Sequence, residues 1–267
     1  MSTLGQEVAA RLQLPPADVD AVLAEHHVST AAAPAAAARL KLGALRFSAV
    51  KTLTGVHADG TSAATDFTAQ VPVEFSWNFG DGLHGVGSEK NLRGKSSVTR
   101  IILWALRGRC DLRDDVRKWL RRVELDFSID ATEYRLGFDV IEGVPSGTLE
   151  RRRDGALTLL GSFVNDDEFE ETMGSTMMSA LSLSAIAAAQ DGRRTQHTWP
   201  TYAGALVVRG DSLDQLLGDT LFAGLPSRLL QMFVGSDWAA ARAEATTAHS
   251  VAKADLAALE ATVRDRI

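Results

Sequence analysis

Alternation of apolar and polar residues is clearest in the middle of the chain. Within RRVELDFSID (121–130), Val123, Leu125 and Phe127 fall on one side and mostly charged residues on the other, and EYRLGFDV (133–140) repeats the pattern. A period of two is the period of a β-strand with one buried face. Because Ile-Asp-Ala-Thr between the segments offers turn residues, the two segments predict an antiparallel hairpin.

Five further segments have strand-like patterns. VPVEFSWNF (71–79) alternates regularly, LKLGALRF (40–47) changes phase as a bulged strand does, and LHGV (83–86) reads as a short strand. TLERRRDGALTLL (148–160) contains Asp-Gly, which suits a two-residue hairpin turn. ALVVRGD (205–211) reads as a short buried strand that ends in a turn.

Helical spacing of apolar residues indicates helices elsewhere. The pattern predicts a helix from about Ser96, a helix over 165–189 that is acidic at its start, and a compact helix at 225–233. Pro15 and Pro16 offer the start of another helix near the N-terminus. The apolar positions of the helix after Ser96 are Val98, Ile101, Ile102, Ala105 and Leu106.

The last segment, 236–267, has apolar residues at alternating spacings of three and four. Those residues are Ala245, Ala252, Leu256, Leu259 and Val263, with His249 at one further position of the same seam. This is the pattern of a coiled-coil helix, which needs a partner helix. The patterns together predict three parts: a helical N-terminal appendage and Ala-rich linker (1–38), a main domain (39–235) and the start of a coiled coil (236–267).

Composition excludes several classes of protein. The 267 residues carry a formal net charge of −6, so there is no overall basic footprint for nucleic acid. Cys110 is the single cysteine, which excludes an intrachain disulfide. No stretch approaches the roughly 20 apolar residues of a membrane span, and no secretory signal pattern opens the chain. We therefore expect a cytoplasmic protein without a membrane partner.

The segment GVGSEKNLRGKSSVTR (85–100) joins a predicted strand to a predicted helix and contains Gly-Lys-Ser-Ser. Such a turn binds a nucleoside triphosphate through backbone N–H groups, the helix dipole, a lysine and a hydroxyl on Mg²⁺. In this interpretation Gly94 allows close approach of the backbone, Lys95 reaches the phosphates, Ser96 is the Mg²⁺ ligand and Ser97 contacts a phosphate oxygen. The alternative is a strand-to-helix turn with a surface lysine.

These residues resemble the N-terminal ATPase lobe of the Rad50/SbcC/SMC type of P-loop (AAA/ABC-like) ATPases. The resemblance covers about residues 39–267, and its specific part is the loop and the helix after it. It implies an α/β fold: a P-loop NTPase N-lobe with a mixed β-sheet, an antiparallel β subdomain, flanking helices and the start of a C-terminal coiled-coil helix. It also implies ATP and Mg²⁺ as cofactors, and Asn91 falls on the family's loop asparagine.

The resemblance extends the expected ATP-binding set to Asn91, Arg93, Gly94, Lys95, Ser96 and Ser97. Arg46, Arg209 and Asp211 are expected near the nucleotide. Three positions depart from the family pattern. Glu89 stands where the first loop glycine belongs, Leu92 where a further glycine is common, and Arg209 where the family has a glutamine that positions Mg²⁺ and water. No catalytic residue is assigned, because the sequence holds neither a signature motif nor an apolar run ending in Asp-Glu.

The resemblance implies a DNA-associated ATPase of repair, chromosome maintenance or anti-phage defence. Hydrolysis would require a C-terminal lobe from the same full-length protein or from another chain, and the implied partners are a second head, DNA and a nuclease. A non-catalytic interaction module with a vestigial loop and a working coiled coil is the alternative. A third possibility is a self-contained P-loop kinase, for which Asp211 is the candidate acidic residue.

Overall fold

The computed structural model describes residues 4–26, 28, 38–54, 68–87, 94–153, 155–190, 193–205, 207 and 239–264. The chain divides into two compact units. One comprises residues 38–181, and the other combines residues 1–37 with 182–267. The predicted strand at 205–211 and the predicted helix at 225–233 lie almost wholly outside the described residues.

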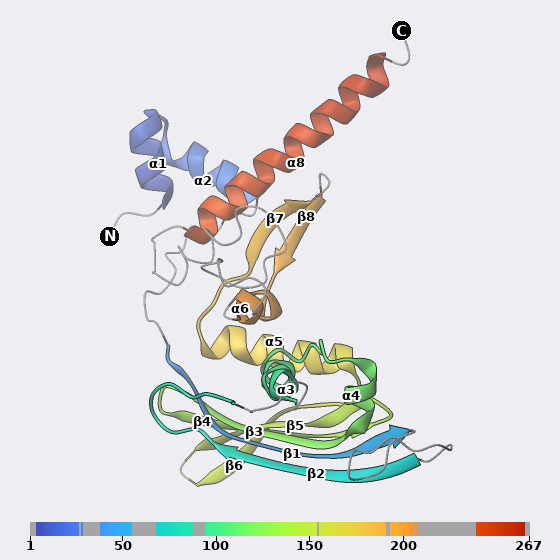
Figure 1. Cartoon of the computed structure of the whole chain (residues 1–267). Helices are drawn as coiled ribbons and strands as arrows, with labels where there is room; N and C mark the ends of the chain where they lie inside the picture. The colour runs from blue at the N-terminus through green and yellow to red at the C-terminus, as the bar shows by residue number, and fades with distance from the viewer. Residues whose placement is uncertain are drawn as a thin grey trace. The chain divides into compact units, whose positions relative to one another are not determined.

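The unit of residues 38–181 is built on a six-stranded sheet with the order β2-β1-β3-β4-β5-β6 (Figure 1). Every pairing among these strands is antiparallel, so the prediction of a mixed sheet is wrong for the described residues. The predicted α/β class and the antiparallel hairpins are confirmed. The strands are β1 Leu40–Thr54, β2 Thr68–Asn78, β3 Leu120–Ile129, β4 Thr132–Ile141, β5 Val144–Arg153 and β6 Ala156–Phe163.

Alternation along the strands gives the sheet one apolar face and one polar face. On β3, Val123, Leu125 and Phe127 are buried, as their spacing predicts. Glu124 and Asp126 lie between them and point to the opposite face. The apolar face is covered by α3 Lys95–Arg107, α4 Asp114–Trp119 and α5 Asp166–Ala180 (Figure 1). We call the other one the open face, because no described helix of this unit lies on it.

The core of this unit lies between the apolar face and the helices. Trp104 of α3 is fully buried, and its ring centroid lies 5.0 Å from that of Phe138 on β4. Phe163 of β6 stacks on Phe169 of α5 at 4.1 Å. These contacts fix α3 and α5 against the sheet, so the core holds the start of α3 in place.

The helix predicted over 165–189 is shorter than expected. α5 ends at Ala180, and Ile186–Gln190 forms β7, which pairs antiparallel with β8 Arg193–His197. Ala187 and Ala188 of β7 are buried. Alanine favours a helix in isolation, but this burial and the hairpin pairing outweigh its propensity here.

The second unit contains that hairpin and four helices among its described residues. Its helices are α1 Leu4–Leu12, α2 Pro16–Glu25, α6 Trp199–Ala205 and α8 Ala239–Arg264. The helix start at Pro15-Pro16 and the C-terminal helix are therefore confirmed, whereas α1 and α6 were not predicted. None of the helices in the described part of the chain has both the length and the apolarity that crossing a bilayer requires.

Two glycines of the first unit should respond oppositely to alanine. Gly108 ends α3 with φ 70°, and a Cβ there would lie 2.6 Å from the backbone of Phe169 and Glu170. We expect Gly108→Ala to lower the free energy of unfolding by about 2 kcal/mol or more, because backbone strain and overlap add. Urea denaturation followed by tryptophan fluorescence measures this loss.

The matched control for this prediction is Gly174→Ala. Gly174 lies inside α5, and an added Cβ would meet nothing within 4 Å beyond the helix's own backbone. We expect this substitution to raise the free energy of unfolding by up to about 1 kcal/mol, because alanine loses less backbone entropy than glycine on forming a helix. Equal effects of the two substitutions would contradict the packing described for Gly108.

Candidate functional site

The first turn of α3 contains Gly94, Lys95, Ser96 and Ser97. Gly94 precedes the helix with φ 82°, in the left-handed region that favours glycine, and its carbonyl accepts from the Val98 N–H at 3.1 Å. The N-cap residue, Gly94, supplies no side-chain cap to this end of the helix. The early N–H groups of an α-helix have no partner within the helix itself, so this end is suited to an anion.

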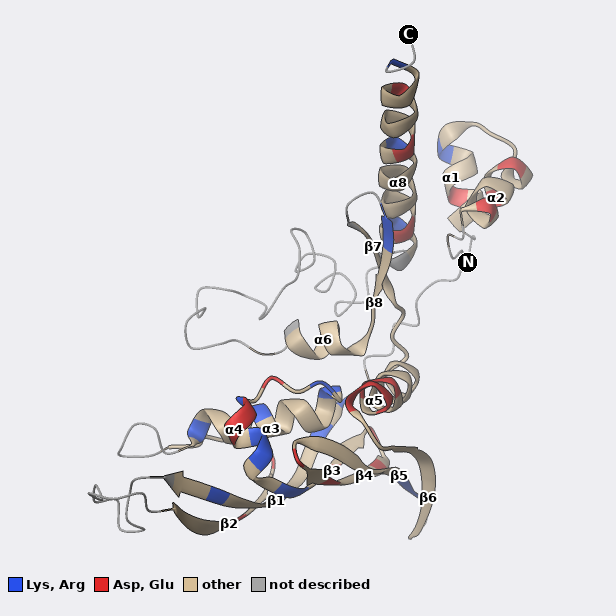
Figure 2. Cartoon of the chain, turned by 90° about the vertical axis from the view of Figure 1, so that its right-hand side faces the viewer, with Lys and Arg blue, Asp and Glu red and all other residues tan. Residues whose placement is uncertain are grey.

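The start of α5 offers a contrast within the same unit. Asn165 accepts the Glu168 N–H at 2.9 Å, and the Glu168 carboxylate accepts the Val164 N–H at 3.0 Å. Three acidic residues occupy the first turn of α5, which Figure 2 shows in red. The acidic first turn predicted here is found, but it is only partly solvated, since Asp166 is half-buried and pairs with Arg117 of α4. Side chains of Asn165 and Glu168 accept backbone N–H groups at this end of the helix.

The first turn of α3 has the opposite chemistry. It has no acidic residue, and it carries the Lys95 ammonium and two hydroxyls. Ser96 is exposed, and Lys95 and Ser97 are half-buried. Four of the predicted ATP-binding residues are thus gathered on one turn. Asn91, Arg93, Arg209 and Asp211 lie outside the described residues, as does Glu89.

The prediction of a strand at 83–86, directly before the loop, is wrong. β2 ends at Asn78, and residues 79–87 form no strand. Gly82 has φ 101° and the Leu83 side chain is fully exposed, so this segment has no buried face to stabilise a strand. Instead the His84 ring packs edge-on against Trp77 and Phe79, and its Nε2 lies 3.0 Å from the Gly80 carbonyl oxygen.

Arg46 lies on the open face of the sheet. Its neighbours on β1, Leu45 and Phe47, are buried on the apolar face against which α3 packs. The Arg46 guanidinium pairs with Asp126 at 3.1 Å and with Glu124 at 3.6 Å. The structure therefore does not bring the Arg46 side chain to the first turn of α3, and its pairing with two carboxylates accounts for it without a nucleotide.

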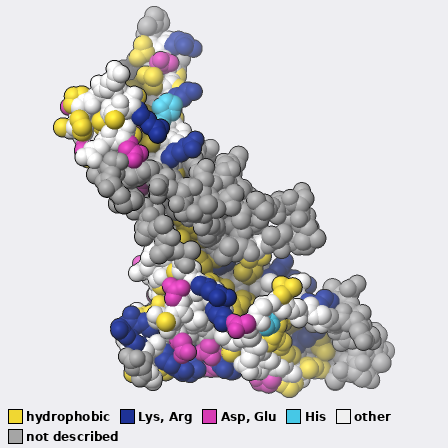
Figure 3. Space-filling model, turned by 90° about the vertical axis from the view of Figure 1, so that its left-hand side faces the viewer, with side chains coloured by type: hydrophobic (Ala, Val, Ile, Leu, Met, Phe, Trp, Pro, Cys, Tyr) yellow, Lys and Arg dark blue, Asp and Glu magenta, His cyan; other side chains and the backbone are white. Residues whose placement is uncertain are grey.

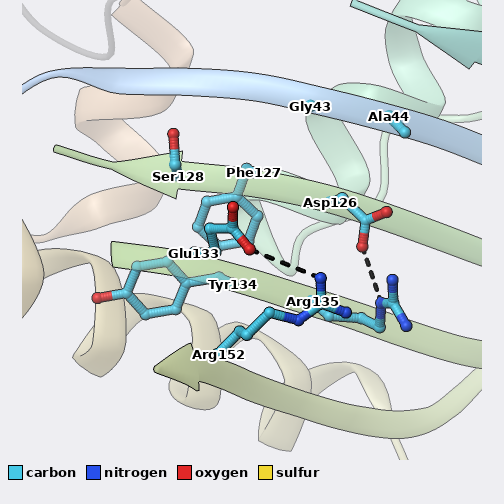
Figure 4. A pocket seen from close by; sticks show the side chains of 9 residues that line it. All are labelled: Gly43, Ala44, Asp126, Phe127, Ser128, Glu133, Tyr134, Arg135 and Arg152. Atoms are coloured by element: carbon cyan, nitrogen blue, oxygen red, sulfur yellow. Dashed lines mark hydrogen bonds and ion pairs between the residues drawn. The ribbon is translucent and has the colours of Figure 1, made fainter. Parts of the chain in front are cut away.

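Sequence reasoning missed the charge network on the open face. Asp126 also accepts from Arg135 at 2.9 Å, and Arg152 pairs with Glu133 at 3.6 Å (Figure 4). These side chains line a shallow cavity of ≈280 Å³. The sequence signal for this charge network is the set of arginines and acidic residues at the polar positions of 121–153. Because each cation in the cavity has a carboxylate partner, the cavity offers no excess charge to an ionic ligand.

Cys110 shows no sign of activation. Burial raises the pKa of its thiol, which disfavours the thiolate that nucleophilic chemistry needs. Within the described residues, no group of three or more His, Cys, Asp or Glu side chains is arranged to hold a metal ion.

The sequence matches no protein-family model and no curated protein. The geometry of the first turn of α3 is the structural observation from which a function can be argued.

Proposed function

We propose that this chain is the ATP-binding N-terminal lobe of a Rad50/SMC-like, DNA-associated ATPase. One observation carries the proposal: α3 begins after a left-handed glycine that supplies no side-chain cap, with a lysine and two hydroxyls and no acid on its first turn. Backbone N–H groups and the helix dipole there favour a phosphate anion. Lys95 would pair with the phosphates, and Ser96 would supply a hydroxyl ligand to Mg²⁺, whose charge offsets that of the phosphates.

The C-terminal helix supports the same proposal. Ala243 and Thr247 of α8 lie on one side of the helix and are buried, and α8 contacts the β7–β8 hairpin. Leu256, Leu259 and Val263 are more than half exposed, and at 3.6 residues per turn they fall on nearly the opposite side. α8 is therefore anchored by one side and presents the predicted seam on the other. We propose that a second helix pairs with this seam, as the coiled-coil pattern requires.

We assign ATP hydrolysis and DNA contact to the proposed assembly rather than to this chain alone. We propose that a C-terminal lobe, in the same full-length protein or in another chain, supplies the catalytic acid. Among the described residues, Lys and Arg side chains intermix with Asp and Glu side chains on the face that Figure 3 shows. A broad basic field is thus not evident on that face, and DNA binding is assigned to the completed assembly.

Isothermal titration of the full chain with ATP in the presence of Mg²⁺ tests the proposal. We expect a dissociation constant in the micromolar to low-millimolar range, and weaker binding when EDTA removes the metal. AMP serves as the matched ligand, because it keeps the adenosine and lacks the β and γ phosphates. Absence of ATP binding in this range, or equal affinity for AMP and ATP, overturns the proposal.

The alternative is a non-catalytic interaction module in which α8 is the working element. The exposed seam of α8 is the observation that favours it. The titration separates the two functions: the interaction module would bind a partner helix through Leu256 and Leu259 but would show no affinity for ATP.

A further inference from the structure

β6 is an edge strand whose uncharged, leucine-rich sequence suits pairing with a strand of another chain. It is the last strand in the sheet order, and no described strand pairs with its outer edge. Its sequence, ALTLLGSF, contains no charged residue and no proline. Leu157 is 45% exposed and Leu159 is 59% exposed. A long apolar edge presents unpaired backbone N–H and C=O groups, to which a further strand can add.

The opposite edge of the same sheet carries features that oppose such pairing. β2 contains Pro72, which has no N–H to donate, and the exposed Glu74. Prolines and charges of this kind protect edge strands from association. Because β2 has these features and β6 has none, strand addition is favoured at the β6 edge only.

The leucines of β6 are also placed for contact across the edge. Leu157 lies opposite Arg152 and Leu159 opposite Glu150, so both leucines are on the open face. Leu160 is an extra residue at a bulge between Leu159 and Gly161, and it is 38% exposed. Burying two leucines from each of two copies would remove apolar surface from water without displacing an ion pair.

The charges that flank β6 indicate its partner. Arg151, Arg152 and Arg153 end β5 next to the start of β6, and Asp166, Asp167 and Glu168 follow its end. Arg152 already pairs with Glu133 and Asp166 with Arg117, so the sign of the charges at each end, and not an unpaired charge, bears on the choice of partner. In an antiparallel pair of β6 strands, the basic end of one strand lies beside the acidic end of the other. A parallel pair would place like charges together. The flanks therefore favour antiparallel self-pairing, which is the geometry of a two-fold dimer.

We propose that β6 pairs antiparallel with β6 of a second copy and joins two six-stranded sheets into one. This dimer needs no nucleotide, so it is distinct from the ATP-dependent pairing of heads in the proposed function. Loss of ATP binding would overturn the proposed function and leave the β6 dimer untouched.

Sedimentation velocity of the full chain without nucleotide tests the inference. We expect a reversible monomer–dimer equilibrium over a concentration series. Leu159→Lys should raise the dissociation constant of the dimer at least about tenfold, because two lysines would meet near the two-fold axis. Ile141→Lys is the matched control, since Ile141 is 68% exposed on β4 of the same sheet, away from the edge, and it should leave the dissociation constant unchanged.

Hydrogen exchange of the wild-type chain keeps the test independent of whether Leu159→Lys folds. Amides of residues 156–163 should exchange more slowly as the concentration rises, and amides of β2 should not. A monomer at every concentration, or a dimer that Leu159→Lys leaves intact, overturns the proposal. Protection of β6 that is strong in the monomer and independent of concentration also overturns it, because another part of the same chain would then cover the edge.

Discussion

Replacing Lys95 by alanine is expected to weaken the binding of Mg·ATP by about tenfold to a hundredfold. Lys95 is the first helical residue of α3, beside the left-handed Gly94. A hydrogen bond from an ammonium group to a phosphate contributes about 1.5–3 kcal/mol, which corresponds to that range of affinity. Titration calorimetry with ATP, with the wild type and the variant at the same Mg²⁺ concentration, measures the change.

Lys118→Ala is the matched control for this prediction. Lys118 is an exposed lysine in the last turn of α4, within the same unit, so both variants lose one positive charge from the same sheet-and-helix unit. We expect its affinity for Mg·ATP to equal that of the wild type. Equal weakening in the two variants would show that overall charge, rather than the first turn of α3, governs the binding, and it would sink the assignment of Lys95.

Much of the sheet could be predicted because its strands are local hairpins. Asp130 at the β3–β4 turn has φ 52°, a conformation that aspartate tolerates, and Gly155, with φ 79°, directly precedes β6. Each of these signals lies within a few residues of the strands it joins. The β7–β8 hairpin was missed because its Ala-rich first strand has no alternating pattern, so residues 186–189 were assigned to the end of the predicted helix.

Only the part of the candidate site formed by residues adjacent in sequence could be predicted. Gly94 to Ser97 are adjacent in sequence, and the helix start they form is found as expected. The pairing of Arg46 with Asp126 depends on the register between β1 and β3, which shifts between Leu42 and Ala44. A bulge of this kind changes which residues face each other across 80 positions of sequence. The phase change in LKLGALRF predicted a bulge in β1, and this prediction is confirmed, but the periodicity of the two strands does not specify the register of β1 against β3.

The largest loss of stability is expected from Trp104→Ala. Trp104 is fully buried in α3 and packs edge-on against Phe138, while the Arg117 guanidinium lies 5.3 Å from its ring centroid. Removing the indole should leave a large cavity beneath α3, and substitutions of this kind cost about 3–5 kcal/mol. Urea denaturation, followed by far-UV circular dichroism because the variant loses a tryptophan, measures the free energy of unfolding.

Trp104→Phe separates the effect of packing from that of the indole N–H. The Trp104 Nε1 is buried and has no hydrogen-bond partner among the described residues. Replacing the indole by a phenyl ring therefore removes a buried polar N–H without breaking a hydrogen bond. A phenyl ring still contacts Phe138, and we expect a loss below about 1.5 kcal/mol. Similar losses for phenylalanine and alanine would contradict the view that ring packing anchors α3, and with it the first turn that carries Lys95, to the sheet.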